Sequence, residues 1–244
     1  MGRADATIID DGLITGSING GVFASVAIPI GGLAVKGRWT PIFSQLASAR
    51  FRDCAGSDTC SPSEANLGHV LEKARALRFR DKLAVVNRVV NRTITYSRDM
   101  AVYGMLDHWA TPAETLARGR GDCEDIAILK MAALMKVGIP ARSMSLVILR
   151  DTRRSVFHAV LSVSTSHGHF ILDNMQDAVL ADAAIPDYQA LYSLSTDRAW
   201  IHGYRKSGAV AAVDTPLETV IPGEGPEPDR LSMAHPALGR LSVW

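Results

Sequence analysis

The sequence predicts an α+β fold in which one central helix is followed by an antiparallel sheet. Apolar side chains recur at helical spacing over residues 123–137, after a turn that ends at Gly121, and Gly138 marks the stop. Three short apolar segments bounded by turns come next, and each is typical of a strand: residues 143–150, 157–165 and 169–173. A helix followed by consecutive strands indicates the α+β class rather than alternating βαβ units.

Two further helices are expected upstream of this unit. Ser61 can cap the first helix, Pro62 suits its first position, and Glu64 completes a capping box. We expect this helix to run to about residue 79, and a second one to cover residues 81–92.

Composition bounds the domain organisation and the kind of partner. The chain has 244 residues, 47% of them hydrophobic, and a formal net charge of +1, which fits one compact domain with a small appendage. The near-zero charge argues against nucleic acid as a partner. We expect an irregular N-terminal segment with short strands over residues 1–60, a catalytic domain over 61–207, and a flexible Pro/Gly-rich tail over 208–244.

The apolar segment near the start of the chain is expected neither to span a membrane nor to act as a leader. Residues 14–35 contain six Gly or Pro residues, and three aspartates precede them where a leader needs positive charge. Cys54 and Cys60 favour a small disulfide loop over a metal clip, because no further Cys or nearby His completes four ligands. A disulfide points to a compartment outside the cytosol.

Cys123 stands at the predicted start of the central helix, where the helix dipole lowers the pKa of a thiol. The flanking carboxylates of Asp122, Glu124 and Asp125 have the opposite effect. Either these acids point away from the sulfur or a cation binds to them. A hard cation such as Ca²⁺ would suit a cluster of oxygen ligands.

A thiolate nucleophile also needs a base and a group that orients the base. His158 lies in the second predicted strand and Asp173 at the end of the third, and hairpin-paired strands would place them side by side. Asp173 could then hold one imidazole nitrogen while the other faces Cys123. Each residue also has a plain structural interpretation: a small buried Cys, a core His and a turn-forming Asp.

Four motifs in this order give the chain a resemblance to a known family. They are Trp109-Ala-Thr-Pro-Ala-Glu114, Gly121-Asp-Cys-Glu-Asp125, His158-Ala-Val-Leu161 and Ile171-Leu-Asp-Asn174. With them, residues 80–205 resemble the bacterial transglutaminase-like cysteine proteinases, the group that includes the LapG-type periplasmic proteases. The resemblance is weaker before residue 80 and does not cover the tail.

The resemblance implies a papain-like core with Cys123 as nucleophile, His158 as general base and then acid, and Asp173 as the orienting group. It implies calcium beside the cysteine, with Asp122, Glu124 and Asp125 as the matching acids. It also implies a protein substrate such as the large surface adhesin of a biofilm, a membrane receptor for a cyclic dinucleotide as partner, and a periplasmic or secreted location.

The proposed chemistry needs an oxyanion hole, and two donors are candidates. The backbone N–H of Cys123 is one, and the Trp109 indole N–H is the other, with a purely packing role for Trp109 as the alternative. His167 and His169 flank a hairpin turn and are expected at the surface. Two other functions stay open: transfer of the same acyl group to an amine, as in a transglutaminase or amidase, and a non-enzymatic calcium-responsive binding module.

Overall fold

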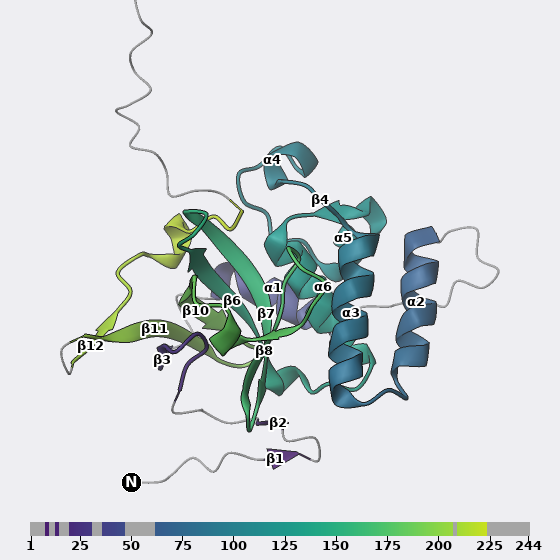
Figure 1. Ribbon diagram of the computed structural model, residues 1–244. Helices are drawn as coiled ribbons and strands as arrows, with labels where there is room; N and C mark the ends of the chain where they lie inside the picture. The colour runs from purple at the N-terminus through teal and green to yellow at the C-terminus, as the bar shows by residue number, and fades with distance from the viewer. Residues whose placement is uncertain are drawn as a thin grey trace, which may run out of the picture.

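The fold consists of one large antiparallel sheet with helices packed against it (Figure 1). The computed structural model describes residues 8–9, 13–14, 20–30, 36–46, 62–206 and 209–223. Within those ranges, no helix has both the length and the apolar character needed to cross a bilayer. The mixed helix and antiparallel sheet architecture confirms the predicted α+β class.

Along the chain, the six helices of the described residues precede the longer strands of the sheet. The helices are α1 (Lys36–Leu46), α2 (Pro62–Ala74), α3 (Phe79–Thr93), α4 (Asp99–Val102), α5 (Pro112–Arg118) and α6 (Cys123–Lys136). The strands are β1 (Ile8–Ile9), β2 (Leu13–Ile14), β3 (Val26–Ile30), β4 (Thr95–Tyr96), β5 (Arg120–Gly121), β6 (Met144–Asp151), β7 (Val156–Thr165), β8 (Gly168–Leu172), β9 (Leu180–Ala181), β10 (Tyr188–Leu194), β11 (Ala199–Lys206) and β12 (Ala209–Ala212). A 3₁₀ turn, η3 (Leu217–Thr219), follows β12.

Strand β7 contains His158 and pairs with β2, β6 and β8. The sheet order is β1-β2-β7-β6-β10-β11-β12, with β3 added to β11 and β8 pairing with both β7 and β9. The β6–β7 hairpin brings Leu149 opposite His158, and the β7–β8 hairpin brings Leu161 opposite Leu172. The three strands predicted from the sequence are therefore β6, β7 and β8, in antiparallel order as expected.

Helix α6 is buried on all sides. Every residue from Cys123 to Leu134 is buried, which is why the apolar residues of this helix are not confined to one stripe. Glu124, Asp125 and Lys130 are the charged residues within this buried stretch. It packs against β7 on one side and α3 on the other. On the opposite face of the sheet, the segment around Val22 and Phe23 covers Val147, Val160 and Ile171. Strands β6 and β7 are thus buried on both faces, which explains the continuous apolar segment Leu146–Leu149.

The predicted boundary between the first two helices was wrong. Helix α2 ends at Ala74 rather than near residue 79, and α3 begins at Phe79. The chain turns through residues 75–78, where Arg78 is extended (φ −70°, ψ 159°) and Leu77 is 39% exposed. The turn lets the two helices pack side by side (Figure 1).

The region expected to be irregular contains a helix as well as short strands. Helix α1 includes Pro41, and such a residue hides a helix from periodicity arguments. Trp39 of this helix packs edge-on against Trp109 with ring centroids 5.5 Å apart, and its indole donates to the Ser195 carbonyl. The expected Cys54–Cys60 loop and the Ser61 cap lie outside the described residues.

The first part of the expected tail is also folded. Strand β12 pairs with β11, and Val220 is 1% exposed in the main core. The sheet therefore continues past residue 207, where the sequence predicted the end of the domain. Residues 216–222 contain two prolines, and their composition resembles that of a linker. The chain nevertheless packs against the core there through Val220.

Candidate active site

Cys123 is the first residue of α6, as predicted. Its side chain is 1% exposed, its thiol donates a hydrogen bond to Glu124 Oε2 at 3.3 Å, and a backbone hydrogen bond from Ala159 reaches the sulfur. Burial, followed by the charges of Glu124 and Asp122, raises the pKa of the Cys123 thiol well above its usual value. Burial and the neighbouring acids thus both favour the neutral thiol when no cation neutralises these acids.

His158 and Asp173 meet as the predicted hairpin geometry requires. His158 lies on β7 and Asp173 follows the last residue of β8, and His158 Nε2 is 2.9 Å from Asp173 Oδ1. Both side chains are 1% exposed. Ala159, which bonds the Cys123 sulfur, is the residue after His158. The structure therefore brings all three predicted segments to one place.

Asp173 has more partners than the sequence indicated. The Met175 backbone N–H donates to Asp173 Oδ1 at 2.9 Å, and Tyr188 Oη donates to Oδ2 at 2.7 Å. Burial alone raises the pKa of Asp173, but the His158 hydrogen bond and charge, with those two donors, lower it to about 2. Tyr188 belongs to β10, and nothing in its local sequence marked it.

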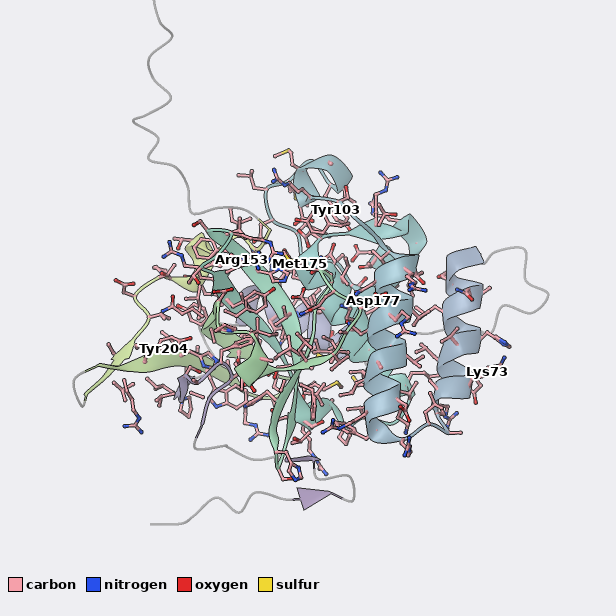
Figure 2. The ribbon with its side chains drawn as sticks, in the orientation of Figure 1. Lys73, Tyr103, Arg153, Met175, Asp177 and Tyr204 are labelled. Atoms are coloured by element: carbon pink, nitrogen blue, oxygen red, sulfur yellow. The ribbon has the colours of Figure 1, made fainter. Side chains whose placement is uncertain are left out.

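Two asparagines of α3 hold the loop that follows Asp173. Asn91 Nδ2 donates to the Asp173 carbonyl at 3.0 Å, and Asn87 Nδ2 donates to the Gln176 carbonyl at 2.8 Å. Asp177 of the same loop pairs with Arg92 at 3.1 Å, beside α3 in Figure 2. These contacts fix the position of the Asp173 backbone from a helix about eighty residues earlier in the chain.

An acidic cluster lies next to Cys123 and is larger than predicted. Two sets of carboxylate oxygens each lie within 4.8 Å of one another, and Asp99 belongs to both: Asp99, Asp107 and Glu124, and Asp99, Asp122 and Asp125. Asp99 and Asp107 come from α4 and the loop after it, and the sequence analysis missed them. Gly121 makes room for the cluster, because a Cβ there would stand 2.7 Å from Asp125 Oδ2.

The acidic cluster has unsatisfied oxygens. Asp99 Oδ1, Asp122 Oδ1, Glu124 Oε1 and Asp125 Oδ2 are buried without a hydrogen-bond partner, and none of the ion pairs of the described residues involves these four acids. Burial and mutual repulsion raise the pKa of Asp122 to about 7 and that of Asp125 to about 8. Buried acceptors of this kind are costly unless a cation or donor binds them.

Trp109 does not fit the proposed oxyanion role. Its indole N–H donates to Asp107 Oδ1 at 3.0 Å, and its ring packs on Trp39. The one N–H of the indole is therefore engaged with the acidic cluster, in agreement with the packing alternative. The residues that follow Trp109 begin α5 with a capping box between Thr111 and Glu114. This capping box explains the Thr-Pro-x-Glu part of the first motif.

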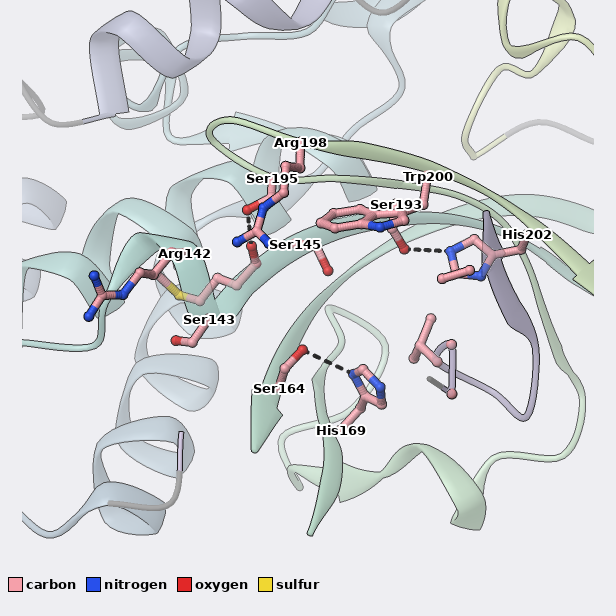
Figure 3. A pocket seen from close by; sticks show the side chains of 15 residues that line it. Arg142, Ser143, Ser145, Ser164, His169, Ser193, Ser195, Arg198, Trp200 and His202 are labelled. Carbon is pink, nitrogen blue, oxygen red and sulfur yellow. Dashed lines mark hydrogen bonds between the residues drawn. The ribbon is translucent and has the colours of Figure 1, made fainter. Parts of the chain in front are cut away.

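A small cavity is lined by residues that do not belong to the site around Cys123 (Figure 3). It has a volume of about 60 Å³ and is lined by His169, His202 and several serines. His202 is satisfied by Ser25 at 2.6 Å and Ser193 at 2.7 Å, and space of this size suits one or two waters. His167 is exposed as expected, whereas His169 is partly buried and bonds Ser162 and Ser164, so its prediction as a surface residue was wrong.

A buried cysteine at a helix start, packed on an antiparallel sheet that presents a His–Asp pair, defines a transglutaminase-like cysteine protease. The chain belongs to the bacterial transglutaminase-like cysteine proteinases (BTLCP), whose family model matches residues 50–202. None of the curated proteins matches the chain.

Solved structures similar to this chain agree with that assignment. LapG of Legionella pneumophila is 26% identical, with 66% of this chain and 86% of that chain covered and a TM-score of 0.53. The calcium-bound form of L. pneumophila LapG is 23% identical over 73% of this chain and 93% of that chain, with a TM-score of 0.54. The EGTA-treated form is 24% identical over 70% and 88%, with a TM-score of 0.54.

Proposed function

We propose that the protein is a cysteine endopeptidase that acts through Cys123, His158 and Asp173. The observation that carries the proposal is the 2.9 Å hydrogen bond between His158 Nε2 and Asp173 Oδ1, next to the residue that bonds the Cys123 sulfur. Because Nε2 faces the carboxylate, Nδ1 is the nitrogen left to take the thiol proton. The low pKa of Asp173 keeps that carboxylate ionised at neutral pH.

In the proposed reaction, His158 takes the proton of Cys123 as the thiolate attacks the carbonyl carbon of a peptide bond. The backbone N–H of Cys123, at the start of α6, is a donor for the oxyanion. His158 then gives its proton to the leaving amine, which departs as the acyl-enzyme forms. Water, deprotonated by His158, attacks the acyl carbon and releases the acid product, and the proton returns to the sulfur.

We further propose that the acidic cluster binds calcium. Asp99, Asp107, Asp122, Glu124 and Asp125 offer oxygen ligands only, and four of these acids have an unsatisfied buried oxygen. Bound Ca²⁺ would supply positive charge that favours the Cys123 thiolate. The existence of calcium-bound and EGTA-treated LapG structures supports this proposal.

The resemblance to LapG-type proteases suggests the biological setting. We propose a periplasmic or secreted location, a large surface adhesin as substrate, and a membrane cyclic-dinucleotide receptor as partner. A comparison of surface proteins released by cells with and without this chain tests the substrate. Absence of any shortened surface protein would contradict it.

The central experiment is cleavage by the purified protein and its Cys123→Ala variant. Surface proteins from cells that lack the protease are the substrate, and peptide mass spectrometry locates new termini. The wild-type protein should produce new termini and the variant none, while the variant keeps the thermal stability of the wild type. If a labelled amine is incorporated into protein instead, acyl transfer rather than hydrolysis is the function.

A further inference from the structure

The C-terminal segment 213–223 returns from the far edge of the sheet to the active site. Val213 N–H donates to the His202 carbonyl at 3.0 Å, and Tyr192 Oη donates to the Thr215 carbonyl at 2.7 Å. Val220 is 1% exposed within the core that also contains Cys123. Three separate contacts thus hold this segment on its way to the site.

Gly223 ends the described segment directly beside the catalytic sulfur. Its backbone N–H donates to the Phe157 carbonyl at 2.8 Å, and an ideal Cβ on Gly223 would stand 4.0 Å from Cys123 Sγ. Phe157 immediately precedes His158. Gly223 therefore lies next to both the sulfur of Cys123 and the strand that carries His158.

The edge of β7 beside the site is suited to bind an extended peptide. Residues 161–165 pair with β8, but residues 156–160 pair only with β6 among the described strands. Their outer side offers backbone groups, and Gly223 bonds one of them as a neighbouring strand would. Addition of an extended segment to an open strand edge is a common way to bind peptides.

Only glycine fits at the point of closest approach. Gly223 has φ +84°, which strains any residue with a side chain, and a Cβ would stand 2.8 Å from Tyr96 Oη. The backbone of Tyr96 is held there because β4 pairs with β5 in register Tyr96↔Gly121, two residues before Cys123. The contact thus depends on the absence of a side chain at position 223.

We infer that residues 215–223 occupy the substrate-binding edge of the active site, with Gly223 in the place of the substrate residue that faces Cys123. The inference rests on the proposed protease function. A protein substrate must first displace this segment. The segment is an internal competitor that lies beside the sulfur of Cys123, a residue that is 1% exposed.

Alkylation of Cys123 by iodoacetamide tests the inference without a need for substrate. The rate at Cys123 is followed by peptide mass spectrometry in the native full chain. Gly223→Ala should raise that rate by about tenfold, because a side chain at positive φ and against Tyr96 favours release of the segment. Gly138→Ala is the matched control, since Gly138 also has positive φ (+93°) and a Cβ there meets only Lys82 Nζ at 3.9 Å. Its rate should stay at the wild-type value.

A synthetic peptide with the sequence of residues 215–226 completes the test. Added to the Gly223→Ala protein, it should slow alkylation back toward the wild-type rate, whereas the same peptide with alanine at position 223 should not. If Gly223→Ala does not fold, Tyr192→Phe replaces it, because this change removes the hydrogen bond to Thr215. That variant should also be alkylated faster than the wild type.

The outcomes separate this inference from the proposed function. Equal alkylation rates in the wild type and in the folded release variants would overturn the inference and leave the protease proposal intact. Faster alkylation in those variants, with no cleavage of surface proteins by any of them, would overturn the protease proposal and leave the covered sulfur established.

Discussion

Two groups of buried carboxylates flank the same cysteine, and they are built in opposite ways. Asp173 has three donors, from His158, Met175 and Tyr188, and its pKa is lowered to about 2. Asp122 and Asp125, at the start of α6, keep unsatisfied oxygens, and their pKa values are raised to about 7 and about 8. Burial is similar in both places, so the difference lies in the partners. Asp125 does accept the Ala110 backbone N–H through Oδ1 at 2.7 Å, but its Oδ2 is left without a donor. A carboxylate with donors to both oxygens is ready to act, whereas one with a buried unpaired oxygen favours a cation from outside.

Loss of the Asp173 charge should have the largest effect. Asp173→Asn keeps the shape but removes the carboxylate that orients His158, and we expect cleavage to slow by roughly a thousandfold or more. Initial rates of substrate cleavage measure this. Asp177→Asn is the matched control, because Asp177 lies in the same loop but contacts Asn91 and Arg92 instead. A comparable loss in the control would mean that loop structure, not the carboxylate, is responsible.

Calcium should raise the thermal stability of the protein. At free calcium about 100 times Kd, binding adds about 2.7 kcal/mol and should raise Tm by about 5 to 10 °C over the EGTA-treated protein. Differential scanning fluorimetry measures the shift. Asp122→Asn combined with Asp125→Asn should abolish it, and a shift of unchanged size in that variant would place the ion elsewhere.

The pH dependence of stability should separate the two groups of acids. Without divalent cations, Asp122 and Asp125 bind protons more tightly in the folded chain than in the unfolded one, whose Asp pKa is about 3.9. Their stabilising contribution is therefore complete below pH 4 and is lost as pH rises through about 7 and about 8. We expect the free energy of unfolding to fall by at least about 2 kcal/mol between pH 5 and pH 9 in EGTA.

Urea unfolding at several pH values measures this dependence, and saturating calcium should flatten it. Asp173 has the opposite sign, because its pKa is lowered. Its contribution is present above pH 4 and is lost only as pH falls toward about 2, outside that range. A stability that rises with pH in EGTA would show that the acidic cluster finds partners within the chain.

Removal of one donor from Asp173 should have the smallest effect. Tyr188→Phe deletes the 2.7 Å hydrogen bond to Oδ2 and leaves the His158 and Met175 bonds in place. We expect a loss of about 1 to 2 kcal/mol in stability and a decrease in cleavage rate of less than about tenfold. A complete loss of activity would instead place Tyr188 among the groups that act on substrate.

The sequence predicted correctly those elements that depend on residues close together in the chain. Periodicity identified α6, and the alternation of apolar segments and turns identified β6, β7 and β8 within one or two residues of their observed ends. The order Cys123, His158, Asp173 followed from that reading. Helix α1 escaped because Pro41 lies inside it, and strand β12 escaped because the Pro-rich sequence after it looks like a linker.

The sequence by itself predicted Cys123 as the candidate nucleophile, its place at a helix start and the strand pair that holds His158 beside Asp173. These features depend on short-range patterns of side chains, because the regular geometry of a helix or a hairpin sets the relative positions of nearby residues. Only the tertiary structure decided that Asp99 and Asp107 join the acids around Cys123, that Tyr188 donates to Asp173, and that Gly223 lies against the sulfur. These contacts join segments far apart in the chain, and their closeness depends on how the whole sheet and its helices pack, which no local pattern records.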